Sequence, residues 1–548
     1  MNSVAIDYIP TDHNNDGHII GIDVAVRTFL DAYLRYSRAE TLYCRTHEHG
    51  AFDRFQNRMI EIGVDPARCQ FLAEADVDTM ANVSTLFRPD PNINGSLSNR
   101  LNANAYSICG LSHTMSSMQV MSTVATAITE QLSPWDAIVC PSNAIRSVVE
   151  ALWDSAGQGA PRPPAQLPVI PLGIDTSHFT SLVDANKRSA QRNVLGIGEN
   201  DTVILAYGRL SYHNKSHPLP LLLAAEAIAQ KRLAAGKAGK IEIVFFGYFT
   251  AESFRDDYAK AASSICQTAN VTFIENHDLR FPDALWAGSD IFVSLVDNIQ
   301  ESFGLTPIEA MACGLPVLVA DWDGYRDTVR DGIDGFLVPT LAPPPGSGQE
   351  LVRRYLAEED VYGEYLAGAS QSIAVDVDAT TTHLERLVER PELRRKMGAA
   401  AQARVRADYD WATIIPTYEE LWQELDVIRH TDASSLRHVE HAITGPKELD
   451  PYLVFRSFPT HTLLESDHIQ LVDQAAVLLT ERLQHRMNMF APVNLITPDE
   501  LPRLLATLNR THTVGGTLAE WPEAARSPLL LTLVWLTKMG VARHYPAE

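Results

Sequence analysis

The residues best placed to do chemistry lie in one stretch, 297–314, which reads DNIQESFGLTPIEAMACG. Two glutamates, Glu301 and Glu309, flank the start of an expected helix. A capping box predicts this start, because Thr306 suits the N-cap and Glu309 stands three residues later. Gly314 should end the helix in a left-handed conformation. Free N–H groups at the helix start, with the helix dipole behind them, would form an anion site beside the two carboxylates.

The elements around this stretch place it at one edge of a sheet. The apolar runs 290–296 and 316–320 have the length of buried strands, so the segment is a strand–loop–helix–strand unit. The N–H groups of Gly304 and Leu305 would then lie at the carboxyl edge of a parallel sheet, where ligands bind. The same pattern also fits an ordinary crossover with a well-capped helix, and both interpretations stay open at this point.

Two cations are predicted at the same edge. Residues 202–207 form a buried apolar run, Gly208 and Arg209 follow it, and Lys215 comes six residues after the arginine. A guanidinium can bind two phosphate oxygens at once and an ammonium adds a point charge, so the pair suits a diphosphate. Two solvated surface cations are the alternative.

The N-terminal 180 residues alternate short apolar runs with amphipathic segments, as an α/β domain does. A polar loop, 11–21, lies between a first strand and a helix over 24–36, an arrangement common on the phosphate side of such domains. The loop lacks the GxGxxG pattern, so a plain turn fits equally well. His113 follows an apolar run at an expected strand end, where it can be catalytic or structural.

Composition restricts the partners of the chain. Its 548 residues carry a formal net charge of −23, which argues against nucleic acid and against a basic membrane-docking surface. The six cysteines form no CxxC pairs, as expected for reduced thiols. No apolar run is long enough for a signal peptide or a transmembrane helix. We therefore expect a cytoplasmic protein, for which peripheral membrane contact stays open.

The C-terminal part is predicted to be mainly helical. Residues 411–428 have a helical pattern that Pro416 interrupts, so a kink or a break is expected there. Residues 431–548 have their own helix caps and apolar runs, and a helix at 527–540 followed by VARHY resembles a winged-helix module. Acidic residues outnumber basic ones in this tail, which favours packing or partner contact over nucleic-acid binding.

Several of these segments together resemble family 4 glycosyltransferases, the retaining, nucleotide-sugar-dependent class with the GT-B fold. The matching pieces are VIPLGID, YGRL with Lys215, DALWAGSDIFV, ESFGLTPIEAMACGLPVLVADWDG and DGIDGFLV, which follow the family's order over roughly 169–430. The resemblance implies an α/β protein with two facing Rossmann-like, doubly wound domains. The N-terminal half matches more loosely, as expected for an acceptor-binding side.

The resemblance also implies domain boundaries. The acceptor-side domain would cover 1–185, and the nucleotide-sugar donor domain would cover 186–410 with an insertion at about 341–378. A helix at 411–430 would cross back to the first domain. Residues 431–548 match nothing in the family core and are expected to form an accessory helical domain.

Single residues receive roles by the same resemblance. Arg209 and Lys215 would hold the donor's diphosphate, and Glu309 would accept hydrogen bonds from the ribose hydroxyls, with a pure capping role as the alternative. The donor-binding set as a whole is Arg209, Lys215, Phe303, Gly304, Leu305, Glu309 and Gly21. Gly21 would let backbone approach phosphate, although the family's paired glycine is missing. Glu301, near the reacting carbon, and His113, near the sugar, would form the catalytic set.

The implied activity is that of a retaining, metal-independent hexosyltransferase in carbohydrate biosynthesis. It would move a sugar from a UDP- or GDP-sugar to a glycan, lipid-linked or small-molecule acceptor. No further cofactor is expected, because two cations and a helix N-terminus can stabilise a diphosphate leaving group. The DxD strings at 321–323 and 376–378 are attributed to chance in an acidic chain. A nucleotide-sugar epimerase and a non-catalytic binding or assembly protein are the alternative functions.

Overall fold

The computed structural model describes residues 3–547 except 9–20, 47–48, 74–79, 81–82, 94–104, 130–131, 282, 284 and 432–449. The chain divides into two compact units. Unit 1 contains Met1–Asp175 and Arg406–Lys447, and unit 2 contains Thr176–Val405 and Glu448–Glu548. No helix of the described ranges is long and apolar enough to cross a membrane.

Unit 1 is built on a six-stranded parallel sheet with strand order β3-β2-β1-β4-β5-β6. Its strands are β1 (Val4–Asp7), β2 (Leu42–Thr46), β3 (Cys69–Ala73), β4 (Thr85–Arg88), β5 (Ser107–Leu111) and β6 (Ala137–Val139). Its helices include α1 (Gly21–Tyr36), α2 (His49–Glu61), α5 (Met118–Thr126) and α6 (Asn143–Gly157). The central strands β1 and β4 are almost wholly buried, because a parallel sheet is covered on both faces.

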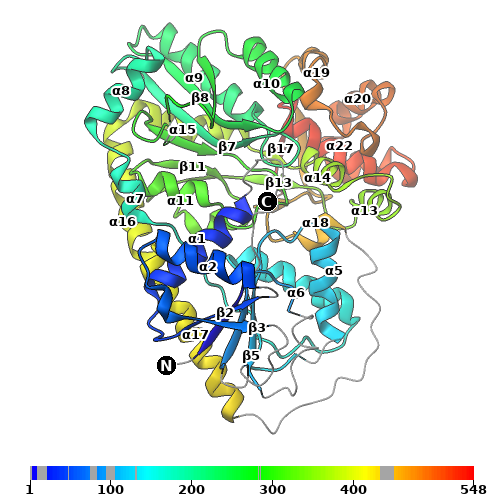
Figure 1. Ribbon diagram of the computed structural model, residues 1–548. Helices are drawn as coiled ribbons and strands as arrows, with labels where there is room; N and C mark the ends of the chain where they lie inside the picture. The colour runs from blue at the N-terminus through cyan, green and yellow to red at the C-terminus, as the bar shows by residue number, and fades with distance from the viewer. Residues whose placement is uncertain are drawn as a thin grey trace. The chain divides into compact units, whose positions relative to one another are not determined.

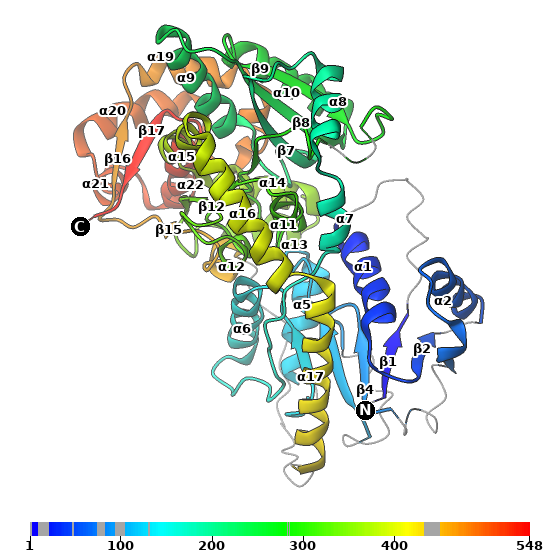
Figure 2. The same cartoon turned by 90° about the vertical axis from the view of Figure 1, so that its left-hand side faces the viewer.

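Helix α17 (Trp411–Thr431) belongs to unit 1 and lies alongside its sheet (Figure 2). The buried side chains of its inner face are Trp411, Ile414, Ile415, Tyr418, Leu421, Trp422 and Leu425, all in one core cluster with strands β1, β2 and β4 to β6. Gly173 makes room for this face, since a Cβ there would lie 2.6 Å from the Trp411 ring. The break considered at Pro416 does not occur. The helix continues through the proline because one missing hydrogen bond costs less than exposing this apolar face.

Unit 2 contains a second six-stranded parallel sheet, with strand order β12-β11-β10-β7-β8-β9 (Figure 1). Its strands are β7 (Thr202–Leu210), β8 (Ile241–Phe249), β9 (Asn270–Glu275), β10 (Ile291–Ser294), β11 (Val317–Ala320) and β12 (Gly335–Val338). The main helices are α7 (Thr176–Ser181), α8 (Ala185–Leu195), α9 (Leu219–Ala234), α10 (Glu252–Ile265), α11 (Leu305–Ala312), α12 (Tyr325–Thr328), α15 (Val377–Glu389) and α16 (Pro391–Asp408). The chain order reverses between β7 and β10, which makes their carboxyl ends the topological switch point. The two doubly wound sheets confirm the predicted fold class.

The segment 340–375 forms a small sheet with the C-terminal tail. It contains β13 (Thr340–Ala342), α13 (Gln349–Leu356), α14 (Tyr362–Gln371) and β14 (Ala374–Val375). Strand β15 (His461–Thr462) of the tail pairs with β13 in parallel, and the strand order is β14-β13-β15. The expected insertion and the tail are therefore joined by backbone hydrogen bonds.

The described part of the C-terminal tail, residues 450–547, falls within unit 2. Its elements are α18 (Pro451–Val454), β15, β16 (His468–Leu471), α19 (Ala475–Leu483), α20 (Leu501–Thr511), α21 (Val514–Ala519), α22 (Arg526–Lys538) and β17 (Ala542–Tyr545). Strands β16 and β17 pair antiparallel, and helices α19 to α22 lie between them along the chain. The wing of a winged-helix module is a hairpin of consecutive strands, so this sheet differs from the expected one.

Candidate functional site

Helix α11 starts earlier than the sequence predicts. Its N-cap is Gly304, which has φ +83° and makes no side-chain cap, so the predicted capping box is wrong. Thr306 instead lies in the first turn, and its hydroxyl is buried without a hydrogen-bond partner in the described structure. Gly304 suits this start because a Cβ there would lie 2.0 Å from Cε1 of Tyr325. Glu309 is therefore not a capping residue and is available for another role.

The end of α11 is as predicted. Gly314 has φ +76°, its N–H donates to the Met311 carbonyl at 2.9 Å, and the N–H of Leu315 donates to the Ala310 carbonyl at 3.0 Å. This pair of bonds is a Schellman motif. At the other end, the first N–H groups have no acceptor within the helix and carry the positive end of its dipole.

The loops after β7, β10 and β11 meet near this helix start. The ammonium of Lys215, after β7, forms an ion pair with the Glu301 carboxylate, after β10, and their side chains are 20% and 14% exposed. Nη2 of Arg209 donates to Oε1 of Gln300 at 2.5 Å and to the Asn214 carbonyl at 2.9 Å. The structure thus brings the two predicted cations and a predicted catalytic carboxylate together at the switch point, partly open to solvent.

The backbone of the β10–α11 loop lies in close contact with the loop that follows β11. Phe303 is 1% exposed, and its chain passes so close to Gly324 that a Cβ there would lie 2.7 Å from Phe303 Cα. Leu305 is the first residue of α11. The two backbone N–H groups predicted to bind phosphate, those of Gly304 and Leu305, therefore belong to the turn at the helix start, and Phe303 of the predicted donor set directly precedes them.

Glu309 is a partly buried carboxyl on α11, and Lys215 is the cation whose charge acts on it. Burial raises its pKa to about 7, and the charge of Lys215 offsets only part of this effect. Its charge in turn adds to the burial that raises the pKa of Tyr207 to about 12. A carboxyl whose pKa is raised by burial suits a ligand that donates hydrogen bonds to it.

Sequence reasoning missed three residues of this cluster: Gln300, Asp323 and Tyr325. Asp323 is 1% exposed, adopts φ +38°, and its Oδ2 has no hydrogen-bond partner in the described structure. Burial, reinforced by the charge of Glu301, raises its pKa well above the usual range. The hydroxyl of Tyr325 lies 2.8 Å from that of Ser294. The available signal for Asp323 was the string DWDG, which ends the longest segment of the family resemblance.

Carboxylates of both DxD strings make contacts within the protein. Asp321 pairs with Arg326 at 2.8 Å and accepts from the Thr460 hydroxyl at 2.6 Å, so its carboxylate is engaged. Asp376 caps α15 by accepting from the Ala379 N–H at 2.8 Å. No group of three or more His, Cys, Asp or Glu side chains in the described ranges is arranged to hold a metal ion.

His113 and Gly21 belong to unit 1, whereas the other predicted site residues belong to unit 2. His113 follows β5, is 5% exposed, and its Nε2–H donates to the Pro89 carbonyl at 2.9 Å. Burial lowers its pKa, so the imidazole is neutral. Gly21 is the first residue of α1, and the loop before it, 9–20, lies outside the described residues.

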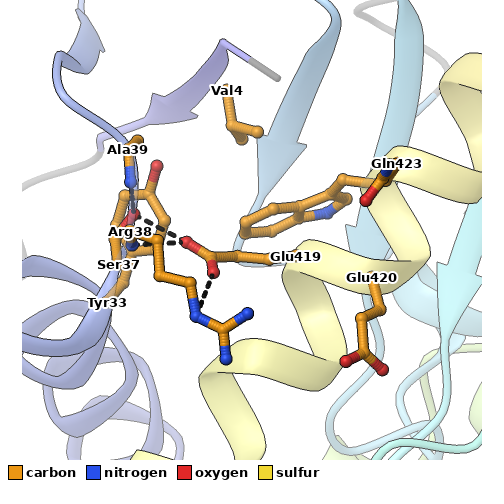
Figure 3. A pocket seen from close by; sticks show the side chains of 9 residues that line it. Val4, Tyr33, Ser37, Arg38, Ala39, Glu419, Glu420 and Gln423 are labelled. Carbon is orange, nitrogen blue, oxygen red and sulfur yellow. Dashed lines mark hydrogen bonds and ion pairs between the residues drawn. The ribbon is translucent and has the colours of Figure 1, made fainter. Parts of the chain in front are cut away.

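A separate pocket of about 330 Å³ lies in unit 1 between the end of α1 and α17 (Figure 3). Its Glu419 carboxylate already accepts from the Ser37 hydroxyl at 2.9 Å and the Arg38 N–H at 2.8 Å. Val4, at the start of β1, also lines it. The pocket therefore lies at the amino edge of the sheet, opposite the edge where α/β sheets bind ligands.

The sequence matches of this chain to known proteins lie mainly in unit 2. Residues 187–359 match the family described as "Glycosyl transferases group 1". This segment is therefore similar in sequence to that family. It spans β7 to β13 and so includes Arg209, Lys215, Glu301 and Glu309.

Two curated relatives show how far the likeness extends. A D-inositol 3-phosphate glycosyltransferase of Mycolicibacterium vanbaalenii is 30% identical over 187 residues, which is 34% of this chain and 40% of that protein. The enzyme of the same name from Rhodococcus opacus is 32% identical over 180 residues, 32% of this chain and 37% of that protein. The match thus spans about two fifths of the length of these relatives.

Solved structures share the fold over a longer stretch. The Anabaena protein Alr3699/HepE in complex with UDP has a TM-score of 0.50 and 17% identity, over 77% of this chain and 100% of that one. A glycosyltransferase from Rickettsia africae has a TM-score of 0.52 and 13% identity, over 77% of this chain and 98% of that one. At these identities the likeness shows the fold, and the fold is GT-B.

Proposed function

We propose that this chain is a retaining, metal-independent glycosyltransferase that moves a hexose-type sugar from a nucleotide-sugar donor to a carbohydrate or glycoconjugate acceptor. The observation that carries the proposal is the convergence of Arg209, Lys215 and Glu301 on the start of α11 at the sheet's switch point. Both cations, the helix dipole and backbone N–H groups there suit a diphosphate. The group 1 match over 187–359 supports the same reaction class.

The proposed chemistry follows from where charge develops. As the bond from the anomeric carbon to the diphosphate breaks, negative charge collects on the leaving oxygen and positive charge on the sugar ring. Lys215 and Arg209 would stabilise the first, and Glu301, released from Lys215, would lie against the second. Two protein cations can supply this stabilisation without a metal ion, which is the reason to propose metal independence.

The remaining roles concern binding. Glu309 would accept hydrogen bonds from the ribose hydroxyls, which supply the donors that the protein does not. His113 would approach the donor sugar, and the segment around Gly21 would approach the phosphates. UDP-sugars are the first donors to test, because UDP is bound in the structure of the Anabaena relative, and GDP-sugars are the second. All six cysteines are free, which suits a reducing compartment such as the cytoplasm.

A thermal-shift panel tests the proposal directly. UDP, GDP, ADP and their glucose or mannose conjugates are added with and without EDTA, and the best stabiliser identifies the donor. We expect one nucleoside diphosphate to raise the melting temperature equally with and without the chelator. Stabilisation by none of them would contradict a nucleotide-sugar function. Dependence on a divalent ion would contradict metal independence alone.

Product analysis separates transfer from the alternatives. With the best donor and a panel of simple glycosides, NMR of the product reports the anomeric configuration and shows whether it is retained. A change of configuration at a ring carbon of the donor without transfer would identify an epimerase. Binding without turnover in every acceptor mixture would favour a non-catalytic protein.

A further inference from the structure

The loop that carries Glu301 is held at its base by a residue from the far end of the chain. Asp297 lies three residues after the end of β10, and its carboxylate forms an ion pair with the ammonium of Lys538. Both side chains are only 1% exposed. The Lys538 ammonium also donates to the Ser370 carbonyl at 2.6 Å, so it is anchored on two sides.

Lys538 is the last residue of α22, 241 positions from Asp297 along the chain. Eight of the residues of this helix before it, from Leu529 to Leu536, are buried without exception. The apolar packing of the helix therefore fixes its position, and its last side chain, Lys538, lies at the base of the loop that carries Glu301. Removing either charge would leave the other buried and unpaired.

The loop that carries Lys215 is tied to the same tail through a histidine. The His217 N–H donates to Oδ1 of Asp297 at 3.3 Å. Nδ1 of His217 accepts from the Leu219 N–H at 3.2 Å, so its Nε2–H donates to the Met487 carbonyl of the tail at 2.9 Å. Asp297 is thus the junction of three segments: its own loop, the Lys215 loop and the tail.

The third site loop, which carries Asp323, also contacts the tail. The Thr460 hydroxyl donates to the Asp321 carboxylate at 2.6 Å, and the Arg326 guanidinium donates to the Ser457 carbonyl. The Phe458 ring packs edge-on against Trp322 with ring centroids 5.4 Å apart. Every loop that brings a charged side chain to the helix start is therefore attached to residues 450–547.

We propose that the tail, residues 450–547, completes the donor site of unit 2, and that Lys538 is a positioning residue for the Asp297–Glu301 loop. The inference rests on the proposed function for what the loop binds. It differs from the expectation that the tail forms an accessory domain beside the donor chemistry. Lys538 touches no donor atom; it acts through Asp297, whose placement sets where Glu301 and Gln300 meet Lys215 and Arg209.

The test compares two positively charged side chains of the same tail in the full-length protein. Lys538→Met removes the buried charge, and Arg543→Gln is the matched control, because Arg543 forms an exposed ion pair with Asp378 at 2.9 Å. UDP and GDP affinities are measured by calorimetry at a temperature where circular dichroism shows each variant folded. We expect Lys538→Met to weaken the better nucleotide about tenfold or more, as a misplaced loop should, and Arg543→Gln to leave the affinity unchanged. Wild-type affinity in folded Lys538→Met would overturn the proposal.

If Lys538→Met does not fold, the pair Asp297→Asn with Lys538→Met takes its place, because it leaves no buried unpaired charge. The same loss of affinity is expected, since the neutral pair no longer holds the loop. Recovery of wild-type affinity in the double variant would overturn the proposal.

Hydrogen exchange keeps this inference separate from the proposed function. Without any nucleotide, the amides of residues 297–303 should exchange at least about tenfold faster in the Lys538 variant than in wild type or Arg543→Gln. Unchanged exchange in this loop would contradict the positioning role. A wild-type protein that binds neither UDP nor GDP would contradict the proposed function instead, whatever the exchange shows.

Discussion

The two ends of one short loop carry the same pair of groups in different surroundings. At its base, Asp297 pairs with Lys538, and both side chains are 1% exposed. At its tip, Glu301 pairs with Lys215, and the side chains are 20% and 14% exposed. Burial raises the pKa of Asp297 and lowers that of Lys538, so burying the ion pair at the base of the loop costs free energy.

The difference shows how similar contacts can have opposite uses. The Asp297–Lys538 pair has no access to solvent or ligand. If either group changed its partner, the other would stay buried as an unpaired charge. The tip pair is partly hydrated, so Lys215 can turn to a phosphate and Glu301 to a sugar at little cost. The Asp297–Lys538 pair therefore suits a structural anchor, and the Glu301–Lys215 pair suits a binding site.

The largest expected effect is the loss of stability when the Asp297–Lys538 ion pair is broken. Asp297→Ala leaves the Lys538 ammonium buried without a counter-charge and should lower the free energy of unfolding by about 3–5 kcal/mol. Urea denaturation measures this loss. Glu301→Ala, the same change at the other end of the loop, should cost less than about 1 kcal/mol. Equal losses at the two positions would contradict the distinction between anchor and site.

The second effect concerns turnover at the tip. Glu301→Gln keeps the shape of the side chain but removes the charge placed against the sugar, so kcat should fall roughly 10²-fold. Steady-state kinetics with the best donor measures it. Because Glu301 is proposed to contact sugar rather than diphosphate, UDP or GDP affinity should stay within about threefold of wild type. A variant that loses nucleotide binding but keeps kcat would reverse the assignment.

Binding at the tip gives the third effect. Lys215→Met removes one charge-assisted contact to phosphate, worth roughly 1.5–3 kcal/mol, so nucleotide affinity should fall about tenfold or more. The free energy of unfolding of Lys215→Met should differ from that of wild type by less than about 1 kcal/mol, in contrast to that of Asp297→Ala. Calorimetry and urea denaturation on the same sample provide both numbers. Arg543→Gln, which removes an exposed cation far from the proposed phosphates in sequence, is the control.

The smallest effect is the pH dependence of Glu309, whose folded pKa is raised from 4.5 to about 7. Between these values the folded state holds the proton more tightly, so this group's contribution to stability falls as pH rises through that window. Glu309→Gln should therefore be more stable than wild type above pH 7, by about 1–2 kcal/mol, and equal to it near pH 4. Thermal unfolding at both pH values measures the difference.

Nucleotide affinity should change with the opposite sign. Ribose hydroxyls donate to the ionised carboxylate, so wild-type affinity should rise between pH 6 and pH 8 by up to about tenfold per unit below the pKa. Glu309→Gln should lose this component while keeping the dependence that comes from the phosphate itself. Identical pH profiles in the two proteins would show that Glu309 does not bind the donor.

Much of the donor-side unit could be predicted from the sequence because its signals are local. The strands β7, β10 and β11 are continuous apolar runs, and Gly314 marks a helix end in the expected left-handed conformation. Arg209, Lys215 and Glu301 could be placed together because parallel strands direct their following loops to one edge. Only chain order and the periodicity of apolar residues are needed for that inference.

The capping box was wrong for a reason that lies outside its own segment. Thr306 and Glu309 have the correct spacing, but the ring of Tyr325 occupies the space beside Gly304 and makes that glycine the helix start. Asp323 was overlooked because its burial and positive φ depend on the packing of two other loops. Short motifs give residue types and spacing, not the neighbours that decide between alternatives.

The sequence by itself determined the fold class, the edge of the sheet where the site lies and the charged residues that meet there, because each follows from the periodicity of apolar residues and from the rule that parallel strands end at one edge. Only the tertiary structure decided the place of the tail. The bond between Lys538 and Asp297 joins residues 241 positions apart. No local pattern marks either residue as a partner of the other, since the pair exists only where folding removes both charges from water.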